Sequence, residues 1–359
     1  MLIGHNGNDK KDQCMLDDLK LIHQRDKSDA LGLAEKQWQE LSTVYDLSVP
    51  ERDYQNVVLA GMGGSALAAE LSKSWPGWRV PFEICRSYQA PNYVDANTLF
   101  IASSYSGNTE ETIAAMEDAE QKGATIVVMA SGGKLVEIAH QKGFVLASLP
   151  VIDKPRYGVL NGYDALVTIG EKAGLLALQN DVKTLSSAAQ SLKQSIAAWV
   201  PTNPVDNNLA KQLALELMGR SVVIYAGNLL YPAAYKWKIS INENSKNVAW
   251  CDAFSEFNHN EFLGWASHPT EKPYGIVYLL TELEHPRIKK RFELTEKLLS
   301  GRWPSPIHVE VQGETLLDQL LWTVALGDFV SIYLAILNGV DSIDPPGKDM
   351  IETFKAQLG

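Results

Sequence analysis

One stretch, residues 100–112, constrains the fold of this chain more than any other. Its sequence is FIASSYSGNTEET, in which a short apolar run ends in small hydroxyl residues. Asn108 or Thr109, followed by glutamate, is typical of the residue that precedes a helix. A strand, a polar turn and a helix N-terminus form an anion site, because free N–H groups and the positive end of the helix dipole point into the turn. The hydroxyls of Ser104, Ser106 and Thr109 add donors, so we expect a phosphate ligand here.

A second turn of this kind lies upstream. The apolar run 57–60 leads into Gly-Met-Gly-Gly-Ser at 61–65, ahead of a predicted helix. Glycines allow the backbone to approach a ligand closely, although the lysine of a nucleotide P-loop is missing. An ordinary capped helix would explain one or two hydroxyls, whereas two such turns favour a phosphate site that includes Gly64 and Ser65.

At these residues the chain resembles the sugar isomerase (SIS) family. GMGGS and SYSGNTEET are similar to the phosphosugar-binding turns of that family. The resemblance implies that Gly64, Ser65, Ser104, Ser106 and Thr109 hold the phosphate of a sugar phosphate.

Length and composition limit the number of domains, the class of partner and the location of the protein. A chain of 359 residues is long enough for two domains. The net charge of −11 argues against nucleic acid as a partner. We expect no membrane span and no signal peptide. Three scattered cysteines, at positions 14, 85 and 251, fit a reducing compartment, and the cytoplasm is the expected location.

The pattern of apolar residues predicts an α/β fold in the first half. Helices within 15–45 are expected to pack on the first domain, after a frayed lead at 1–12. Strands are predicted at 57–60, 80–85, 98–102, 125–130 and 144–148, with helices at 64–74, 109–122 and 134–142. This alternation indicates a parallel sheet covered by helices on both faces.

A connector at 149–163 and helices at 164–179 and 182–199 lead to a second α/β unit. Its predicted elements are helices at 206–218, 231–246, 314–338 and 348–358, and strands at 221–226, 275–280 and 306–311. The repeated strand, glycine turn and helix indicate two tandem SIS domains, each a parallel sheet flanked by helices. The predicted division is 1–50 (helical extension), 51–163 (first domain and connector), 164–204 (linking helices) and 205–359 (second domain).

Two motifs in the second half carry candidate chemistry. Glu243 lies in Asn-Glu-Asn-Ser-Lys and His259 in Asn-His-Asn-Glu. The two side chains could meet if the intervening chain turns back, but spacing does not establish this. Taken alone, each is more often a solvated or structural residue than a catalytic one.

Within the SIS family these motifs resemble the bifunctional phosphoglucose/phosphomannose isomerases. The resemblance implies that Glu243 is the base, that His259 is the acid–base histidine, and that Arg156 is the arginine of the connector. It places a further lysine of that subfamily at Lys355, in the last helix. Outside the resemblance, Arg156 and Lys355 would be read as surface charges.

The chemistry of aldose–ketose isomerisation suits these residue types. One carboxylate, Glu243, can move the proton between C2 and C1 through an enediol. Histidine side chains can exchange a proton near neutral pH, so His259 suits ring opening, assisted by Lys355. Arg156 can stabilise the negative charge of the enediol as a fixed cation.

No metal or other cofactor is expected. His259, Glu261 and His268 do not have a known metal-ligand spacing. The resemblance implies a phosphorylated hexose as substrate and a homodimer, in which His259 acts in its own chain or in the site of the neighbouring subunit.

Two alternatives differ in class. One is a non-catalytic SIS-type sugar-phosphate-binding regulator, which would carry a DNA-binding domain that the acidic lead does not provide. The other is the isomerase part of a glucosamine-6-phosphate synthase, which needs a glutaminase domain for which the sequence before residue 51 is too short.

Overall fold

The computed structural model describes residues 15–152, 155–178, 182–343, 353–354 and 356–357. The chain divides into two compact units. We call Lys36–Gln190 the first unit, and Met1–Glu35 with Ser191–Gly359 the second unit. The domain boundaries expected at 50, 163 and 204 stay a prediction.

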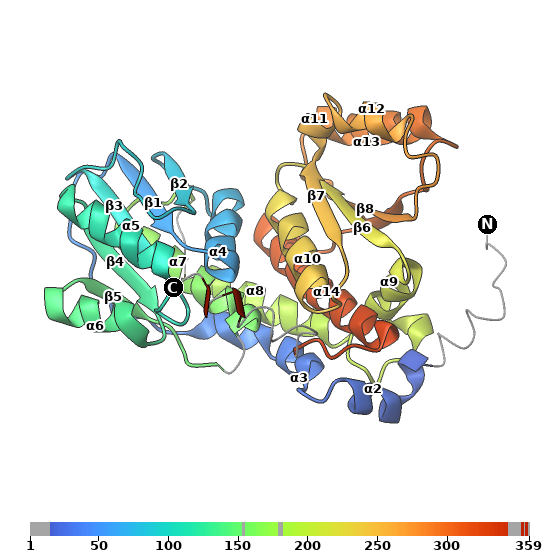
Figure 1. The fold of residues 1–359 in the computed structure, drawn as a ribbon, viewed down its shortest axis with the longest axis horizontal. Helices are drawn as coiled ribbons and strands as arrows, with labels where there is room; N and C mark the ends of the chain where they lie inside the picture. Colours follow the sequence, from blue (N-terminus) through green and yellow to red (C-terminus); the bar gives the residue numbers. More distant parts are fainter. Residues whose placement is uncertain (1–14, 153–154, 179–181, 344–352, 355, 358–359) are drawn as a thin grey trace. The chain divides into compact units, whose positions relative to one another are not determined.

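A parallel sheet of five strands forms the centre of the first unit, in the order β2-β1-β3-β4-β5 (Figure 1). All five strands lie where the sequence predicts them: β1 (Asn56–Ala60), β2 (Phe82–Cys85), β3 (Thr98–Ser103), β4 (Thr125–Ala130) and β5 (Val145–Ser148). The central strands are apolar at nearly every position because both faces of the sheet are buried.

Helices cover both faces of this sheet. They are α4 (Gly63–Ser74), α5 (Glu110–Gln121), α6 (Gly133–Lys142) and α7 (Val159–Lys172). Leu59 of β1 packs in one apolar cluster with residues of α4 and α7, and Val58 packs in the other with residues of α5 and α6. The neighbouring strands β1 and β3 are therefore followed by helices on opposite faces. In such sheets a crevice opens at the carboxyl ends of these two strands.

The helix α7 begins five residues before its predicted start and ends earlier than predicted. The sequence suggests a connector up to residue 163, but residues 159–163 are buried within the first unit. Tyr163 donates a hydrogen bond to the carbonyl of Trp75 at 2.9 Å, and Tyr45 donates to the carbonyl of Asn161 at 3.0 Å. Tertiary packing thus extends the helix into a segment with weak local preference.

The second unit contains a parallel sheet of four strands in the order β7-β6-β8-β9. Its strands are β6 (Ser221–Ala226), β7 (Ala249–Ala253), β8 (Tyr274–Leu280) and β9 (Ile307–Glu310). The predictions of β6, β8 and β9 are confirmed, and β7 was not predicted. Two parallel sheets flanked by helices confirm the predicted fold class.

The helices of the second unit follow the sequence pattern only in part. Its elements are α8 (Val182–Ile196, which begins in the first unit), η3 (Val205–Asn207), α9 (Leu209–Leu217), α10 (Tyr231–Glu243), α11 (Phe254–Phe257), α12 (Glu261–Trp265), α13 (Pro286–Leu299) and α14 (Leu316–Asn338). The sequence predicts neither α11, α12 nor α13, and α10 ends three residues before its predicted end. The helix predicted at 348–358 lies largely outside the described residues.

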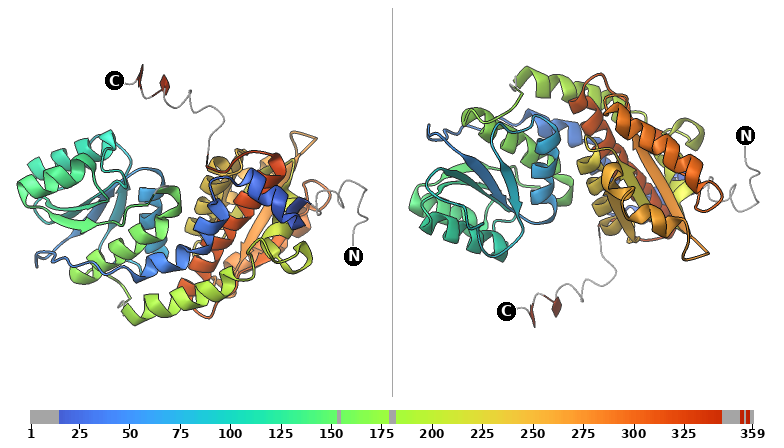
Figure 2. Two further views of the ribbon diagram at one scale, coloured as in Figure 1. Left: turned by 90° about the horizontal axis from the view of Figure 1, so that it is seen from below. Right: turned by 90° about the horizontal axis from the view of Figure 1, so that it is seen from above.

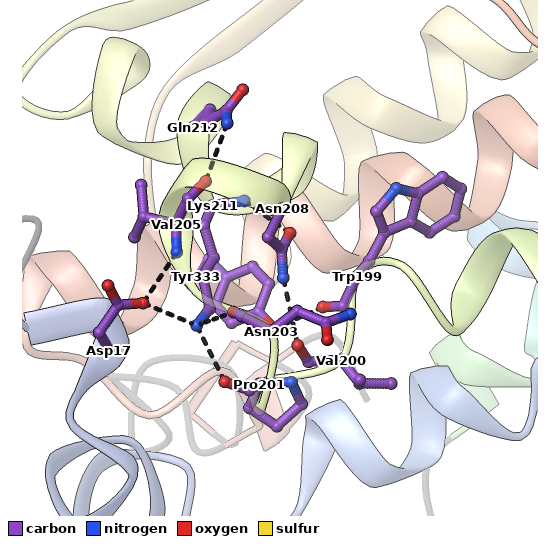
Figure 3. Close-up of polar contacts among 10 residues, drawn as sticks. All are labelled: Asp17, Trp199, Val200, Pro201, Asn203, Val205, Asn208, Lys211, Gln212 and Tyr333. Carbon is purple, nitrogen blue, oxygen red and sulfur yellow. Dashed lines mark hydrogen bonds and ion pairs between the residues drawn. The ribbon is translucent and has the colours of Figure 1, made fainter.

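The N-terminal helices α2 (Leu19–Arg25) and α3 (Ala30–Glu35) belong to the second unit, so the expectation that they pack on the first domain is wrong. The contacts of Lys211 explain why the N-terminal segment belongs to the second unit (Figure 3). Its fully buried ammonium group donates to the carbonyls of Pro201 and Asn203 at 2.9 and 2.7 Å and lies 3.3 Å from the carboxylate of Asp17. This ion pair fixes the segment before α2 to α9. The short helix η1 (Gln37–Ser42) instead packs on α7 in the first unit.

The helix α14 is the one described helix that is long and apolar enough to cross a membrane. Its apolar window is completely buried inside the protein, as expected for the core helix of a globular unit. Figure 2 shows it lying among the other helices of the second unit. It contacts α3, α9 and α10.

Candidate active site

The two glycine- and hydroxyl-rich turns lie side by side at the carboxyl edge of the first sheet. Gly61 follows β1 directly, and Ser104 follows β3. The backbone N–H of Tyr105 donates to Ser65 Oγ at 3.3 Å, which joins the two turns. A Cβ atom on Gly61 would lie 2.9 Å from the carbonyl oxygen of Ser103. Only glycine therefore allows the turns to approach this closely.

A pair of hydroxyls marks the second turn. Ser104 Oγ lies 2.7 Å from Thr109 Oγ1, and Ser104 is buried. Thr109 precedes α5 as predicted, but among the described residues its side chain makes no capping bond, because it pairs with Ser104 instead. The pair uses one hydroxyl hydrogen between its members. The second hydroxyl hydrogen of the pair is not used in this contact and can donate to a ligand at the start of α5.

The turn is held by a third loop that the sequence analysis did not single out, the connection between β4 and α6. Gly107 has φ +69°, and a Cβ atom there would lie 1.8 Å from the carbonyl oxygen of Gly132. Asn108 Oδ1 accepts the backbone N–H of Lys134 at 3.0 Å. The exposed Ser106 accepts the backbone N–H of Asn108 at 3.3 Å. The Ser-Gly-Gly at 131–133, directly after a predicted strand, was the available signal.

The connector that carries Arg156 lies beside the same turns. Arg156 is half-buried in the short helix η2 (Pro155–Tyr157). Two residues later, a Cβ atom on Gly158 would lie 3.0 Å from the ring of Tyr105. Val159 Cγ2 lies 3.6 Å from the Cβ position of Gly64. The first unit thus brings together the segment of Arg156 and all five predicted phosphate-binding positions.

Glu243 is the last residue of α10 in the second unit, and its side chain is exposed. The neighbouring side chains are bound to the protein. Asn244 donates to Ser331 Oγ at 2.9 Å, and Lys246 donates to the carbonyls of Glu243 and Ser342 at 2.7 and 2.9 Å. The motif therefore forms a fixed turn that presents a carboxylate to solvent.

His259 lies between α11 and α12, and its side chain is exposed. The neighbouring Asn258 donates to Thr295 Oγ1 at 2.9 Å and accepts from Arg291 at 3.0 Å. Glu261 accepts from the hydroxyl of Tyr225 at 2.6 Å. Burial raises the pKa of the Glu261 carboxyl group, an effect that this hydrogen bond partly opposes. The motif is thus anchored on both sides of the histidine.

The second unit does not bring Glu243 and His259 together. The helix α10 runs back from the carboxyl end of β6, so Glu243 lies at the amino end of β7. His259 follows the carboxyl end of β7. A strand of five residues spans about 15 Å. The chain therefore does not turn back between the two motifs, and they lie at opposite edges of the sheet. Lys355 lies outside the described residues.

Among the described residues, no group of three or more histidine, cysteine, aspartate or glutamate side chains is arranged to hold a metal ion.

Solved structures with the same fold identify the class. A glucose-6-phosphate isomerase-like protein from Thermus thermophilus superposes with a TM-score of 0.61 at 20% identity, covering 92% of this chain and 98% of that one. The C-terminal domain of glucosamine-fructose-6-phosphate aminotransferase from Francisella tularensis has a TM-score of 0.62 at 15% identity, covering 91% of this chain and 97% of that one. The chain therefore has the double SIS fold.

Sequence comparison identifies the family to which this chain belongs within that fold class. Residues 206–358 match the family described as bacterial phospho-glucose isomerase C-terminal SIS domain. The bifunctional phosphoglucose/phosphomannose isomerase of Caldicellulosiruptor bescii is 34% identical, over 89% of this chain and 95% of that protein. The enzyme of the same name from Aquifex aeolicus is 31% identical, over 87% and 93%. This chain belongs to the family of bifunctional phosphoglucose/phosphomannose isomerases, and it is an isomerase.

Proposed function

We propose that this chain interconverts glucose 6-phosphate and mannose 6-phosphate with fructose 6-phosphate by proton transfer through an enediol. The observation that carries the proposal is the identity of 34% over nearly the whole chain with an enzyme named for both activities. Glucose and mannose 6-phosphates are epimers at C2 and give the same enediol, so one base can serve both.

The turns of the first unit bind the phosphate in this proposal. Gly64, Ser65, Ser104, Ser106 and Thr109 surround the start of two helices at the carboxyl edge of the sheet. Backbone N–H groups at these helix ends and the hydroxyls can donate to the phosphate oxygens. The hydrogen bonds that join the turns support a site that is formed before the ligand binds.

The proton is moved by Glu243, which takes it from C2 and returns it to C1, or the reverse. General base catalysis of this kind contributes about 10²–10⁴-fold to the rate. His259 opens the sugar ring, with Lys355 assisting at the ring oxygen. Arg156 stabilises the negative charge of the enediol. Exposure of Glu243 and His259 on anchored motifs supports these roles, because both side chains can reach a ligand.

We further propose a homodimer in the cytoplasm that acts on this phosphosugar without a metal ion and without nucleic acid or membrane partners. The placement of Glu243 and His259 at opposite edges of one sheet supports the dimer. A site that needs both side chains then takes them from two different chains.

The decisive assay measures isomerisation of glucose 6-phosphate and mannose 6-phosphate separately, each with and without EDTA. Turnover of both sugars, unchanged by EDTA, is the expected result. Turnover of glucose 6-phosphate alone would contradict the dual activity. Loss of turnover with EDTA would contradict the metal-free mechanism. Thermal stabilisation by fructose 6-phosphate without any turnover would favour a sugar-phosphate sensor.

A further inference from the structure

Tyr105 lies between Ser104 and Ser106 in the turn after β3, and its backbone joins three loops at the carboxyl edge of the first sheet. Its N–H group donates to Ser65 Oγ at 3.3 Å in the turn after β1. Its carbonyl oxygen accepts two hydrogen bonds from Ser131 in the loop after β4, from the backbone N–H at 3.0 Å and from Oγ at 2.7 Å. The backbone of Tyr105 is therefore fixed relative to all three loops.

The side chain of Tyr105 reaches the connector that carries Arg156. Its hydroxyl group donates a hydrogen bond to the carbonyl of Pro150, which precedes Arg156 in the chain. After Arg156, the Cβ position of Gly158 lies 3.0 Å from Cε2 of the same ring, so a larger residue than glycine would press on the ring. Tyr105 thus contacts the connector both before and after Arg156.

The phenol ring of Tyr105 is itself held in place. It packs against the apolar cluster that contains Leu59. Burial raises the pKa of its hydroxyl group, and the negative charge of Glu40 adds to this effect. The hydroxyl therefore stays protonated at neutral pH and acts as a donor. Its removal would leave the carbonyl of Pro150 without this partner, which costs free energy in a partly buried position.

We propose that Tyr105 is a positioning residue, which fixes Arg156 relative to the phosphate turns by holding the connector on both sides of Arg156. This role rests on the functions proposed above for Arg156 and for the phosphate turns. The phosphate group on C6 and the enediol at C1 and C2 lie at opposite ends of the same hexose, so the groups that bind them need a fixed separation. Misplacement of a catalytic group by about 1 Å can lower the rate about 100-fold.

Tyr105→Phe tests the proposal, because it removes the hydroxyl and keeps the ring. We expect kcat with glucose 6-phosphate to fall about tenfold or more. The inhibition constant of inorganic phosphate should be nearly unchanged, since the backbone hydrogen bonds to Ser65 and Ser131 remain. Tyr54→Phe is the matched control. Tyr54 donates to the carbonyl of Pro50 at 2.8 Å, just before the amino end of β1, and its loss should leave kcat unchanged.

A double variant shows whether Tyr105 acts through Arg156. Arg156→Ala should lower kcat, and adding Tyr105→Phe should lower it little further, because the guanidinium group that Tyr105 positions is gone. A merely structural loss would lower kcat by the same factor in both backgrounds, and this result would overturn the proposal. A rise in the inhibition constant of phosphate as large as the fall in kcat would also overturn it, since the effect would then lie in the phosphate turns.

Limited trypsin digestion of the full-length protein gives a readout that needs no turnover. Lys154 precedes a proline and resists trypsin, so cleavage within the connector falls at the bond after Arg156. We expect Tyr105→Phe to be cut there about tenfold faster than the wild type, and Tyr54→Phe at the wild-type rate. A wild-type rate in Tyr105→Phe would overturn the proposal. Faster cleavage together with an unchanged kcat in Arg156→Ala would confirm that Tyr105 holds the connector and would refute the catalytic role proposed for Arg156.

Discussion

The ammonium group of Lys236 on α10 and the carboxylate of Asp328 on α14 form an ion pair that is closed off from water, with side chains 4% and 2% exposed. Ser240 completes the cluster. Its hydroxyl lies 2.7 Å from Asp328 Oδ1, and Lys236 donates to Ser240 Oγ at 2.6 Å. The loss of hydration of two buried charges is offset only when their remaining hydrogen bonds are made. The cluster ties the helix that ends at Glu243 to the core helix of the second unit.

Removal of one member of this pair should therefore destabilise the protein strongly. We expect Asp328→Asn and Lys236→Met each to lower the free energy of unfolding by about 3–5 kcal/mol, since an unpaired charge or polar group stays buried. The double variant Lys236→Met with Asp328→Leu should recover much of this loss. Urea unfolding followed by circular dichroism measures it.

The exposed pair Lys290–Glu293 offers the matched control, because its side chains are 59% and 64% exposed. Lys290→Met should change the free energy of unfolding by less than about 1 kcal/mol. If Lys236→Met lowered the free energy of unfolding as little as Lys290→Met, the buried pair would contribute no more to stability than the exposed pair.

Asp164 on α7 should make stability depend on pH. Its side chain is buried, Oδ2 has no hydrogen-bond partner among the described residues, and burial raises the pKa of the carboxyl group from 3.8 to about 7. Between these values the folded protein holds the proton and the unfolded chain does not. Stability therefore falls as pH rises from about 4 to about 7, by roughly 4 kcal/mol in total.

Asp164→Asn removes this penalty. We expect its melting temperature to exceed that of the wild type at pH 8 and to differ little at pH 4, as measured by scanning calorimetry. Asp46→Asn changes an exposed carboxylate of the same unit and should show no such difference between the two pH values. An unchanged pH dependence in Asp164→Asn would mean that the Asp164 carboxylate is ionised without penalty.

The central strands β1, β3 and β4 of the first sheet could be predicted because they are buried on both faces and consist of nearly continuous apolar residues that end in polar turns. The edge strand β7 (AWCDA) could not, because its residues are mostly half-exposed and include an aspartate. The helix α13 was missed for a related reason. It is rich in charged residues and buries only Ile288, Phe292, Thr295 and Leu299.

The candidate site was likewise predictable only in part. The adjacency of the two hydroxyl-rich turns was predictable, since parallel strands place their carboxyl ends at one edge of the sheet, and both turns follow apolar strands. Phosphate binding by these turns stays a prediction. The relation between Glu243 and His259 depends on β7, which carries the chain from one edge of the sheet to the other. Because β7 is not predicted, the sequence between the two motifs does not show whether the chain turns back or continues to the other end of the strands. The sequence left open whether the side chains meet, and the fold separates them.

Glu243→Gln tests the proposed base. The amide keeps the size of the side chain but cannot accept the proton, so we expect kcat to fall by about 10²–10⁴-fold with KM nearly unchanged. The melting temperature should not move, because the side chain is exposed. Glu216→Gln, at an exposed position of α9, is the control. Normal turnover in Glu243→Gln would assign the base to another residue.

Ser104→Ala combined with Thr109→Ala tests the phosphate turn. Hydrogen bonds to a charged group contribute about 1.5–3 kcal/mol each, so KM for fructose 6-phosphate should rise at least about tenfold, with a smaller change in kcat. The inhibition constant of inorganic phosphate should rise in parallel. Ser186→Ala on the surface of α8 should change neither constant. A wild-type KM in the double variant would refute the assignment of these two hydroxyls.

The separation of Glu243 from His259 leads to a prediction about mixed dimers. If each site takes Glu243 from one chain and His259 from the other, a hybrid of Glu243→Gln and His259→Ala chains has one site with both defects and one intact site. Unfolding and refolding an equimolar mixture of two inactive variants should then restore about one quarter of wild-type activity, because half the dimers are hybrids with one working site. If both side chains act within one chain, every site in the mixture carries a defect and no activity returns. A mixture of Glu243→Gln with Ser104→Ala, Thr109→Ala chains, assayed in the same way, reports whether the phosphate turns and Glu243 of one site also come from different chains.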